Sequence, residues 1–391
     1  MKKILLLLTL VTPIPALADS IDEILEKIAS NNLELQLQQN IVEAQQIENK
    51  AENVLGDLSV TYSSFYEQGE GSDHGSEFVA TQAVDFPTQY LSRHKQAELE
   101  NASFSMQYLT AKRDILLKAQ LLCLDIIYLN QEKELLDIRL KNADRLEELY
   151  KVRFNAGDAN ALDVNRVKME RMNVQTLVAV NNAAHRTAMQ SLLTMNGNKP
   201  VEFNAKEYPQ IAEIRDFNAL KDEVMDSDPD LMSLSYATQA ADEQVSISQQ
   251  EWLPKLELGF RRNTDNNKAM NGFVVGGSIP LFSNRHQVKI SKVEAINAQL
   301  VKKDAELHIE NSLMSLYNEM LQLKETMQSY DTELMYSSLE LLQKALDEGE
   351  ISIIEYFIEA ESIYNKLLTR MEIENQYRKV LADIYKNRLI D

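Results

Sequence analysis

The chain has 391 residues, of which 44% are hydrophobic and 26% charged, and its formal net charge is -20. Glycine (11) and proline (8) are scarce, which excludes collagen-like and proline-rich proteins and favours long helices. The single cysteine, Cys123, excludes a disulfide framework. The negative charge argues against broad binding of nucleic-acid phosphates, so nucleic acid is not an expected partner.

Residues 1–18 have the features of a signal peptide. Lys2 and Lys3 precede an apolar run at 4–11, and Ala16-Leu17-Ala18 supplies the small residues of a cleavage site. No later segment is long and apolar enough for a transmembrane helix. We therefore expect an exported protein that could span a membrane only through β-strands arranged as a barrel.

The rest of the chain follows one plan twice. Each half is expected to contain a helix, a β-hairpin, a very long helix and, after a glycine, a shorter helix. These elements are expected at 20–54, 57–86, 90–153 and 159–193, and again at 216–251, 253–282, 287–346 and 351–389. Turn-forming residues between the halves indicate a linker at 196–215. We predict two structural repeats, 19–195 and 216–391, on either side of it.

Recurring residues support a duplication. Gly157 and Asp163 return at the same spacing as Gly349 and Glu355, and Phe86-Pro87 returns as Ile279-Pro280. The helix at 90–153 would reach about 96 Å if it were continuous. In the second half, steps of three and four residues predict a coiled-coil seam. That seam comprises Leu313, Leu316, Met320, Leu323, Met327, Tyr330 and Leu334.

The two hairpins alternate apolar and polar residues, as amphipathic strands do. The apolar residues are Leu58, Val60, Tyr62, Phe78, Val84, Phe86, Leu256, Leu258, Phe260, Phe273, Val275 and Ile279. Each segment has about ten residues, close to the ~9–11 residues of a tilted membrane strand. Four strands cannot close a membrane barrel, and open edges cannot face lipid, so several copies would have to assemble. A small soluble sheet capping a coiled coil is the alternative.

This organisation resembles the TolC-like outer-membrane efflux family over essentially the whole mature chain. The resemblance rests on the duplicated plan, on Gly157…Leu162-Asp163-Val164 and Gly349…Ile354-Glu355, and on Trp252-Leu253-Pro254 ahead of Gly277-Ser278-Ile279-Pro280. The segment 345–356 is similar to heavy-metal efflux members. The resemblance implies a mainly α fold with a small β part, in which duplicated long coiled-coil helices accompany four strands per protomer. It further implies a homotrimer with a 12-stranded β-barrel in outer-membrane lipid and an α-helical tunnel in the periplasm.

The resemblance also implies roles for individual residues. It makes the chain the passive channel of a tripartite system with a periplasmic adaptor and an inner-membrane pump. Gly157, Asp163 and Gly349 would lie at the periplasmic tips that contact the adaptor, and Glu355 would line the entrance gate. A second acid of the family is absent, because Ile358 occupies its place. Three Glu355 side chains in a ring would attract cations and raise one another's pKa; a solvated helix acid is the alternative.

The remaining motifs indicate no catalytic, cofactor-binding or metal site. The chain has no nucleophile elbow, P-loop, Rossmann fingerprint or paired-histidine spacing, and we do not expect an enzyme. Two other functions remain open: the outer-membrane channel of a type I protein secretion system, and a periplasmic coiled-coil scaffold or adaptor without a pore.

Overall fold

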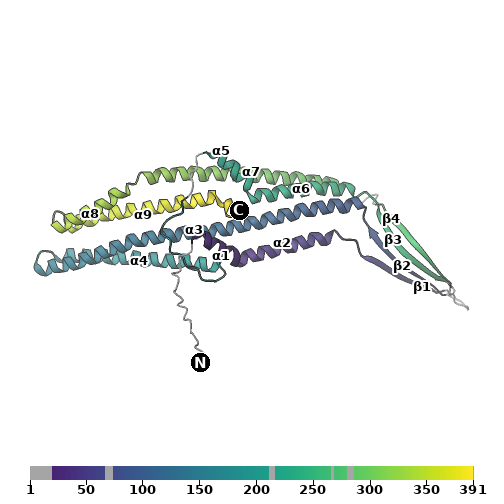
Figure 1. The fold of residues 1–391 in the computed structure, drawn as a ribbon, viewed down its shortest axis with the longest axis horizontal. Helices are drawn as coiled ribbons and strands as arrows, with labels where there is room; N and C mark the ends of the chain where they lie inside the picture. The colour runs from purple at the N-terminus through teal and green to yellow at the C-terminus, as the bar shows by residue number, and fades with distance from the viewer. Residues whose placement is uncertain (1–19, 67–73, 211–215, 266–267, 280–285, 391) are drawn as a thin grey trace, which may run out of the picture. The chain divides into compact units, whose positions relative to one another are not determined.

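The computed structural model describes residues 20–66, 74–210, 216–265, 268–279 and 286–390 (Figure 1). These residues are mainly helical and contain a four-stranded antiparallel sheet, which confirms the predicted fold class for one protomer. The predicted signal peptide, residues 211–215 of the linker and residues 280–282 of the second hairpin lie outside the described residues. No helix within the described ranges is both long enough and apolar enough to cross a bilayer.

The elements follow the duplicated plan in chain order. The first half contains α1 (Ile21–Asn31), α2 (Leu33–Glu52), β1 (Leu58–Tyr66), β2 (His74–Val84), α3 (Pro87–Ala156) and α4 (Ala161–Met195). The second half contains α5 (Phe217–Ser227), α6 (Pro229–Gln250), β3 (Lys255–Asp265), β4 (Lys268–Ser278), α7 (Gln287–Gln328), α8 (Thr332–Glu348), α9 (Ile353–Ile384) and the 3-10 helix η1 (Lys386–Ile390).

Internal contacts divide the chain into two compact units. Unit 1 comprises Met1–Leu33, Ile115–Glu213 and Leu316–Ile384, and unit 2 comprises Glu34–Asp114, Ile214–Ser315 and Tyr385–Asp391. Each unit draws segments from both halves of the chain. The two sequence repeats are therefore interleaved in the fold, and their common origin stays a prediction.

The helices expected at 20–54 and 216–251 are each interrupted, and the expectation of continuous helices is wrong there. Asn32 separates α1 from α2, and Asp228 separates α5 from α6. Asp228 has extended backbone angles, and its side chain accepts hydrogen bonds from the first turn of α6, where Pro229 has no N–H to satisfy. Since α1 and α5 both have 11 residues, the two breaks fall at equivalent places in the plan.

The long helix of the second half is also interrupted, whereas α3 is continuous over 70 residues. Asp331 restarts the helix by accepting a hydrogen bond from the Leu334 backbone N–H at 2.9 Å. Leu313 and Met320 of the predicted seam are buried, but beyond the break Leu334 is exposed and Met335 is buried instead. Beyond the break, the buried position therefore comes one residue later than the 3-4 pattern predicts.

In unit 1, α3, α4, α8 and α9 share one apolar core. Its buried members are Leu135, Leu146, Tyr150, Val167, Met335, Leu346, Ile353, Tyr356, Ala360, Tyr364 and Leu367. The segment that follows α4 has no helix or strand, yet Phe203 is fully buried. Asn130 also donates a hydrogen bond to the Ala205 carbonyl at 2.9 Å. The predicted linker is thus packed onto the helices over its described part.

Candidate functional site: the sheet and the helix tips

The sheet has the strand order β1-β2-β3-β4, and every neighbouring pair is antiparallel. Directly opposed residues of such a sheet point to the same face. Three rows of opposed residues are Leu58–Gln82–Leu258–Val275, Val60–Ala80–Phe260–Phe273 and Tyr62–Phe78–Arg262–Asn271. Val84 and Leu256 are opposed two residues further along on the same face. The register therefore gathers apolar residues of all four strands on one face, which we call the apolar face.

The apolar face is open in the described residues. Phe273 is 93% exposed, Val275 77% and Tyr62 68%. Leu58, Val60, Phe78, Leu256, Leu258 and Phe260 are also exposed. Soluble monomers rarely leave a contiguous apolar patch of this kind uncovered, so the face requires a lipid or protein partner.

The opposite face, which we call the charged face, carries ionic side chains. Arg261 pairs with Glu77 across β2 and β3. At the end of the sheet near the helices, Lys255 pairs with Asp85 at 3.4 Å, and Arg93 of α3 donates to the same carboxylate at 2.8 Å. Apart from Gln82, Arg262 and Asn271, the first face is thus apolar over the rows named above, whereas the second carries the ion pairs, as in a wall between lipid and water.

The strands are also about as long as the strands of outer-membrane barrels. An 11-residue strand such as β3 extends about 37 Å at ~3.4 Å per residue. Tilted by ~45°, it covers about 26 Å, close to the ~25 Å apolar band of outer-membrane barrels. Phe86 and Ile279, predicted as strand residues, lie just beyond β2 and β4. The Phe86 carbonyl already accepts the Gln89 N–H at 2.8 Å, because Pro87 begins α3.

The chain reverses with the same geometry at the two helical tips, which follow α3 and α8. Gly157 and Gly349 have φ angles of +83° and +79°, a region that glycine tolerates far better than other residues. At the first tip, the Asp158 N–H bonds to the Arg153 carbonyl at 2.8 Å and the Gly157 N–H to the Phe154 carbonyl at 3.1 Å. The second tip repeats both bonds at 2.9 and 3.2 Å. Both helices therefore end in a Schellman motif.

The recurring acids have a local role at these tips. Asp163 accepts from the Asn160 N–H at 3.2 Å, while the Asn160 side chain accepts from the Asp163 N–H at 3.0 Å. Glu355 and Ser352 repeat this exchange at 2.8 and 3.2 Å. These are capping boxes that begin α4 and α9. Sequence reasoning missed Asn160 and Ser352, although an N-cap residue three positions before an acid is the signal that could have revealed them.

The capping box also shifts the pKa of Glu355 within one protomer. Hydrogen bonds from the Ser352 backbone and side chain lower the pKa of the exposed Glu355 carboxyl. This shift is opposite to the one that mutual repulsion in a ring would cause. In a single chain Glu355 is therefore ionised at neutral pH, as it would be with its ordinary pKa, and its role at an entrance stays a prediction.

Behind the tips, polar contacts join the two helical hairpins of unit 1. Buried Arg139 of α3 donates to Glu170 of α4 at 2.9 and 2.6 Å and lies over the Tyr364 ring at 5.0 Å. Asn142 donates to the Tyr356 hydroxyl at 2.5 Å. Burial raises the pKa of Tyr364 to about 12, so the hydroxyl stays neutral. These contacts hold α9 against α3 near the tips.

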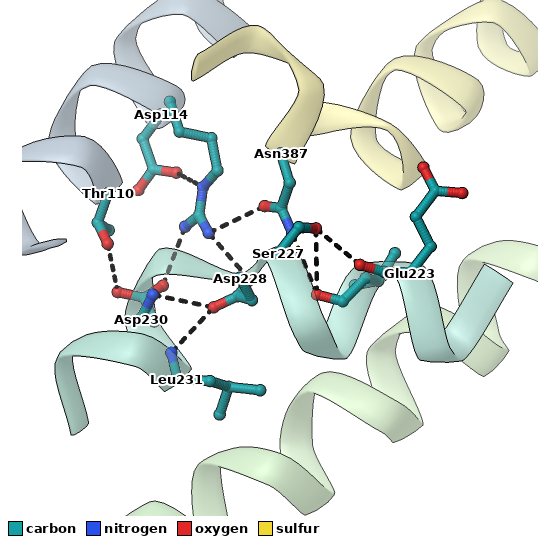
Figure 2. Close-up of polar contacts among 10 residues, drawn as sticks. Thr110, Asp114, Glu223, Ser227, Asp228, Asp230, Leu231 and Asn387 are labelled. Atoms are coloured by element: carbon teal, nitrogen blue, oxygen red, sulfur yellow. Dashed lines mark hydrogen bonds and ion pairs between the residues drawn. The ribbon is translucent and has the colours of Figure 1, made fainter. Parts of the chain in front are cut away.

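Unit 2 contains a buried ionic cluster that sequence reasoning also missed (Figure 2). Arg113 donates to Asp228 at 3.0 Å, to Asp230 at 3.0 Å and to Asp114 at 2.9 Å. Its remaining contact is the Asn387 amide oxygen at 3.3 Å, and the Asn387 amide nitrogen reaches the Val224 carbonyl and the Ser227 hydroxyl. The cluster thereby fastens the α5–α6 break to α3 and to η1.

Within the described ranges, no group of three or more His, Cys, Asp or Glu side chains is placed to hold a metal ion. Burial raises the pKa of the Cys123 thiol to about 12, which makes it a poor ligand and nucleophile at neutral pH.

No family model and no curated protein matches the sequence. Solved structures do match the fold. The chain superposes on the channel protein CusC with a TM-score of 0.79 at 11% identity, covering 95% of this chain and 92% of CusC. A membrane protein from Pseudomonas aeruginosa gives 0.80 at 13% identity over 95% and 90%. The outer-membrane channel OprN gives 0.77 at 13% identity over 94% and 89%.

The chain has the TolC-like fold. The resemblance drawn from the sequence is thus confirmed at the level of the fold. In this TolC-like chain, β1–β2 and β3–β4 are the two hairpins, and Gly157 and Gly349 turn the two helical tips. The structure places Asp163 beside the first tip and Glu355 beside the second, in one repeated arrangement.

Proposed function

We propose that this protein is the outer-membrane channel of a tripartite efflux system. The open apolar face of the four-stranded sheet is the observation that carries the proposal, because lipid is the partner that such a face fits. The charged face would then line an aqueous pore. The TolC-like fold, shared with proteins described as outer-membrane channels, supports the same conclusion.

Self-association follows from the edges of the sheet. β1 and β4 each pair on one side only within the described residues, and open strand edges are not tolerated in hydrocarbon. Pairing β4 of one copy with β1 of the next would satisfy both edges. Three copies would close a barrel of 12 strands, as in the family that the sequence resembles.

The helices that flank the sheet support the same pairing of copies. α2 precedes β1, and opposite its buried side it carries an exposed heptad seam: Leu37, Asn40, Ala44, Ile47 and Ala51. α7 follows β4 and has an exposed seam of its own: Val293, Ile296, Leu300, Leu307 and Met314. Such seams pair helices. Exposed acids on α2 (Glu43, Glu48) would meet exposed lysines on α7 (Lys289, Lys292, Lys303).

The tips would provide the contact with a periplasmic adaptor, which would in turn connect the channel to an inner-membrane pump. Gly157 and Gly349 reverse the chain there, and exposed apolar side chains, Phe154 and Leu162, lie next to the first turn. Nothing in the described residues suggests an energy source, so conduction would be passive. Asp163 and Glu355 would place carboxylates at the periplasmic entrance of the channel.

The experiment that tests the proposal is single-channel recording of the purified full-length protein in planar lipid bilayers. Stable conductance by a detergent-extracted oligomer is the expected result. A water-soluble monomer that gives no conductance would refute the proposal and would favour a periplasmic scaffold.

A further inference from the structure

The apolar face of the sheet becomes polar towards its distal end, which is the end where the two hairpins turn (Figure 1). Two rows of opposed residues form this polar end, and we call them the distal belt: Tyr62–Phe78–Arg262–Asn271 and Ser64–Ser76–Thr264–Ala269. The first row brings a guanidinium and an amide onto a face that is otherwise apolar nearer the helices, and the second row brings three hydroxyls.

The distal belt is positively charged. Arg262 is the single lysine or arginine of the described strands that lies on the apolar face. The acids of those strands are Glu77, Glu257 and Asp265, and the register places all three on the charged face. The adjacent Arg261 pairs with Glu77 there. The charge of Arg262 is therefore not balanced by a carboxylate of the described strands.

The polar groups of the distal belt are also free to bind a ligand. Arg262 and Asn271 are exposed, and in the part of the chain that the structure describes neither side chain has a hydrogen bond or an ion pair. Gln82, a polar residue of the same face nearer the helices, differs from them because it donates to the Gly56 carbonyl at 2.7 Å. The belt thus presents donors that the fold does not use.

The position of Arg262 fits the boundary between a membrane and water. A charge at the centre of the hydrocarbon is costly, whereas near the interface it costs little. Arg262 lies three residues before the end of β3 at Asp265, and a long arginine side chain can extend towards water. Tyrosine is enriched at the same depth, and Tyr62, which is 68% exposed, lies in the same row.

The proposed function decides which side of the membrane the distal belt faces. The helices lie at the other end of the sheet and would extend into the periplasm. If the apolar face contacts lipid, the distal belt therefore lies at the headgroups of the outer leaflet.

Donors without a carboxylate match a phosphate group. Arginine presents a planar fork of N–H groups that binds a phosphate through two hydrogen bonds. Asn271 is directly opposite Arg262, so their Cβ atoms are about 5 Å apart and both side chains can reach one phosphate. Four strands at ~4.8 Å spacing make the belt about 14 Å wide, which leaves room for sugar hydroxyls beside the phosphate. A phosphorylated glycolipid has this combination of groups.

We propose that the distal belt binds the phosphate groups of lipopolysaccharide, the phosphorylated glycolipid of the outer leaflet. Arg262 is the charged contact and Asn271 the neutral one. The location of the belt in the outer leaflet rests on the proposed function. The recognition of phosphate rests on the register of the strands, the unbalanced charge and the unused donors.

Titration of the purified full-length protein with lipopolysaccharide in a non-ionic detergent tests the proposal. Native mass spectrometry counts the lipid molecules bound at each concentration and so gives an apparent affinity. We expect saturable binding of lipopolysaccharide and much weaker binding of the same glycolipid after removal of its phosphates. Equal binding of the two forms would overturn the recognition of phosphate. Displacement of the lipid by an equal concentration of inorganic phosphate would overturn the assignment to a lipid.

Two adjacent arginines provide a matched pair of variants. Arg262→Gln removes the charge of the distal belt, and Arg261→Gln removes the same charge from the opposite face. Both side chains are exposed, so neither substitution removes core packing. Arg262→Gln should weaken lipopolysaccharide binding about fivefold or more, the factor that one charge at contact distance gives in water, and Arg261→Gln should leave the affinity unchanged. Equal affinities for the wild type and Arg262→Gln would overturn the inference, and so would an equal loss in both variants.

The conductance measurement separates this inference from the proposed function. A protein that conducts but does not bind lipopolysaccharide refutes the glycolipid site and leaves the channel assignment intact. A protein whose lipopolysaccharide binding depends on Arg262 but that does not conduct supports the site and refutes the channel.

Discussion

Removing the guanidinium of Arg113 should destabilise unit 2 far more than removing a similar group at the surface. The side chains of Arg113 and Asp228 are only 5% and 3% exposed. Arg113→Met keeps much of the side-chain volume but leaves the Asp228 carboxylate buried without its charged partner. Breaking a buried pair in this way costs about 3–5 kcal/mol. Asp114 and Asp230 are half exposed, so water would compensate most of their loss.

The matched control is Arg145→Met in unit 1. Arg145 pairs with Asp347 at 3.0 Å, but the two side chains are 44% and 42% exposed, and such pairs contribute about 0.2–1 kcal/mol. Guanidinium-induced unfolding of the detergent-solubilised protein, followed by circular dichroism, measures both variants. Hydrogen exchange at the α5–α6 break shows whether the loss is local.

A second substitution tests the stated cause. Asp228 also caps α6 by accepting from the Asp230 and Leu231 N–H groups at 3.0 and 3.1 Å. Asparagine caps a helix as well as aspartate does, so Asp228→Asn in the Arg113→Met background removes the unpaired charge and retains the cap. We expect this double variant to recover at least half of the lost stability. The reasoning is wrong if Arg113→Met costs no more than Arg145→Met, or if Asp228→Asn restores nothing.

Three further predictions concern the tips and the contact between copies. Gly349→Ala should destabilise the second tip by about 1 kcal/mol because of its positive φ. A steric clash adds nothing, since a Cβ atom there would meet nothing within 4 Å. Differential scanning calorimetry measures the loss of stability. Ser352→Ala should raise the pKa of Glu355 part of the way to its ordinary value, because it removes the bond from the Ser352 hydroxyl and keeps the larger effect of the Ser352 backbone N–H. A carboxyl whose pKa is lowered by folding stabilises the folded state at any pH above its unfolded-state pKa, and this stabilisation is lost as the pH falls through its folded-state pKa. Ser352→Ala should therefore lose more stability at pH 7 than at pH 3. Ile47→Glu should dissociate the oligomer on native gels and leave the helix content unchanged. The control Gln39→Glu, which lies outside the exposed seam of α2, should leave the oligomer intact. A stable Ile47→Glu oligomer would contradict the pairing through α2.

The parts of the fold that local periodicity controls could be predicted from the sequence. The two-residue alternation of Leu58, Val60 and Tyr62 survives in the structure because one face of the sheet is apolar and the other is charged. The chain reversals at Gly157 and Gly349 were likewise visible, because a positive φ demands glycine.

Features that depend on a single residue or on distant residues could not be predicted. A continuous apolar period runs across Asn32 and Asp331, so the pattern conceals the helix breaks there. The Arg113 cluster joins Asp228 and Asn387, which are far apart in the chain. No local pattern indicates which of the many charged residues will be buried together.

Spin labels on adjacent residues of β4 test the central claim most directly. Phe273 lies on the apolar face and Val274 on the charged face. Native Cys123 is fully buried, so cysteines introduced at 273 and 274 can be labelled selectively. In proteoliposomes, the label at 273 should be relaxed by oxygen, which concentrates in lipid, and the label at 274 by a water-soluble nickel chelate. If both labels respond to the chelate, the sheet does not face lipid, and the account of this protein as a membrane channel is wrong.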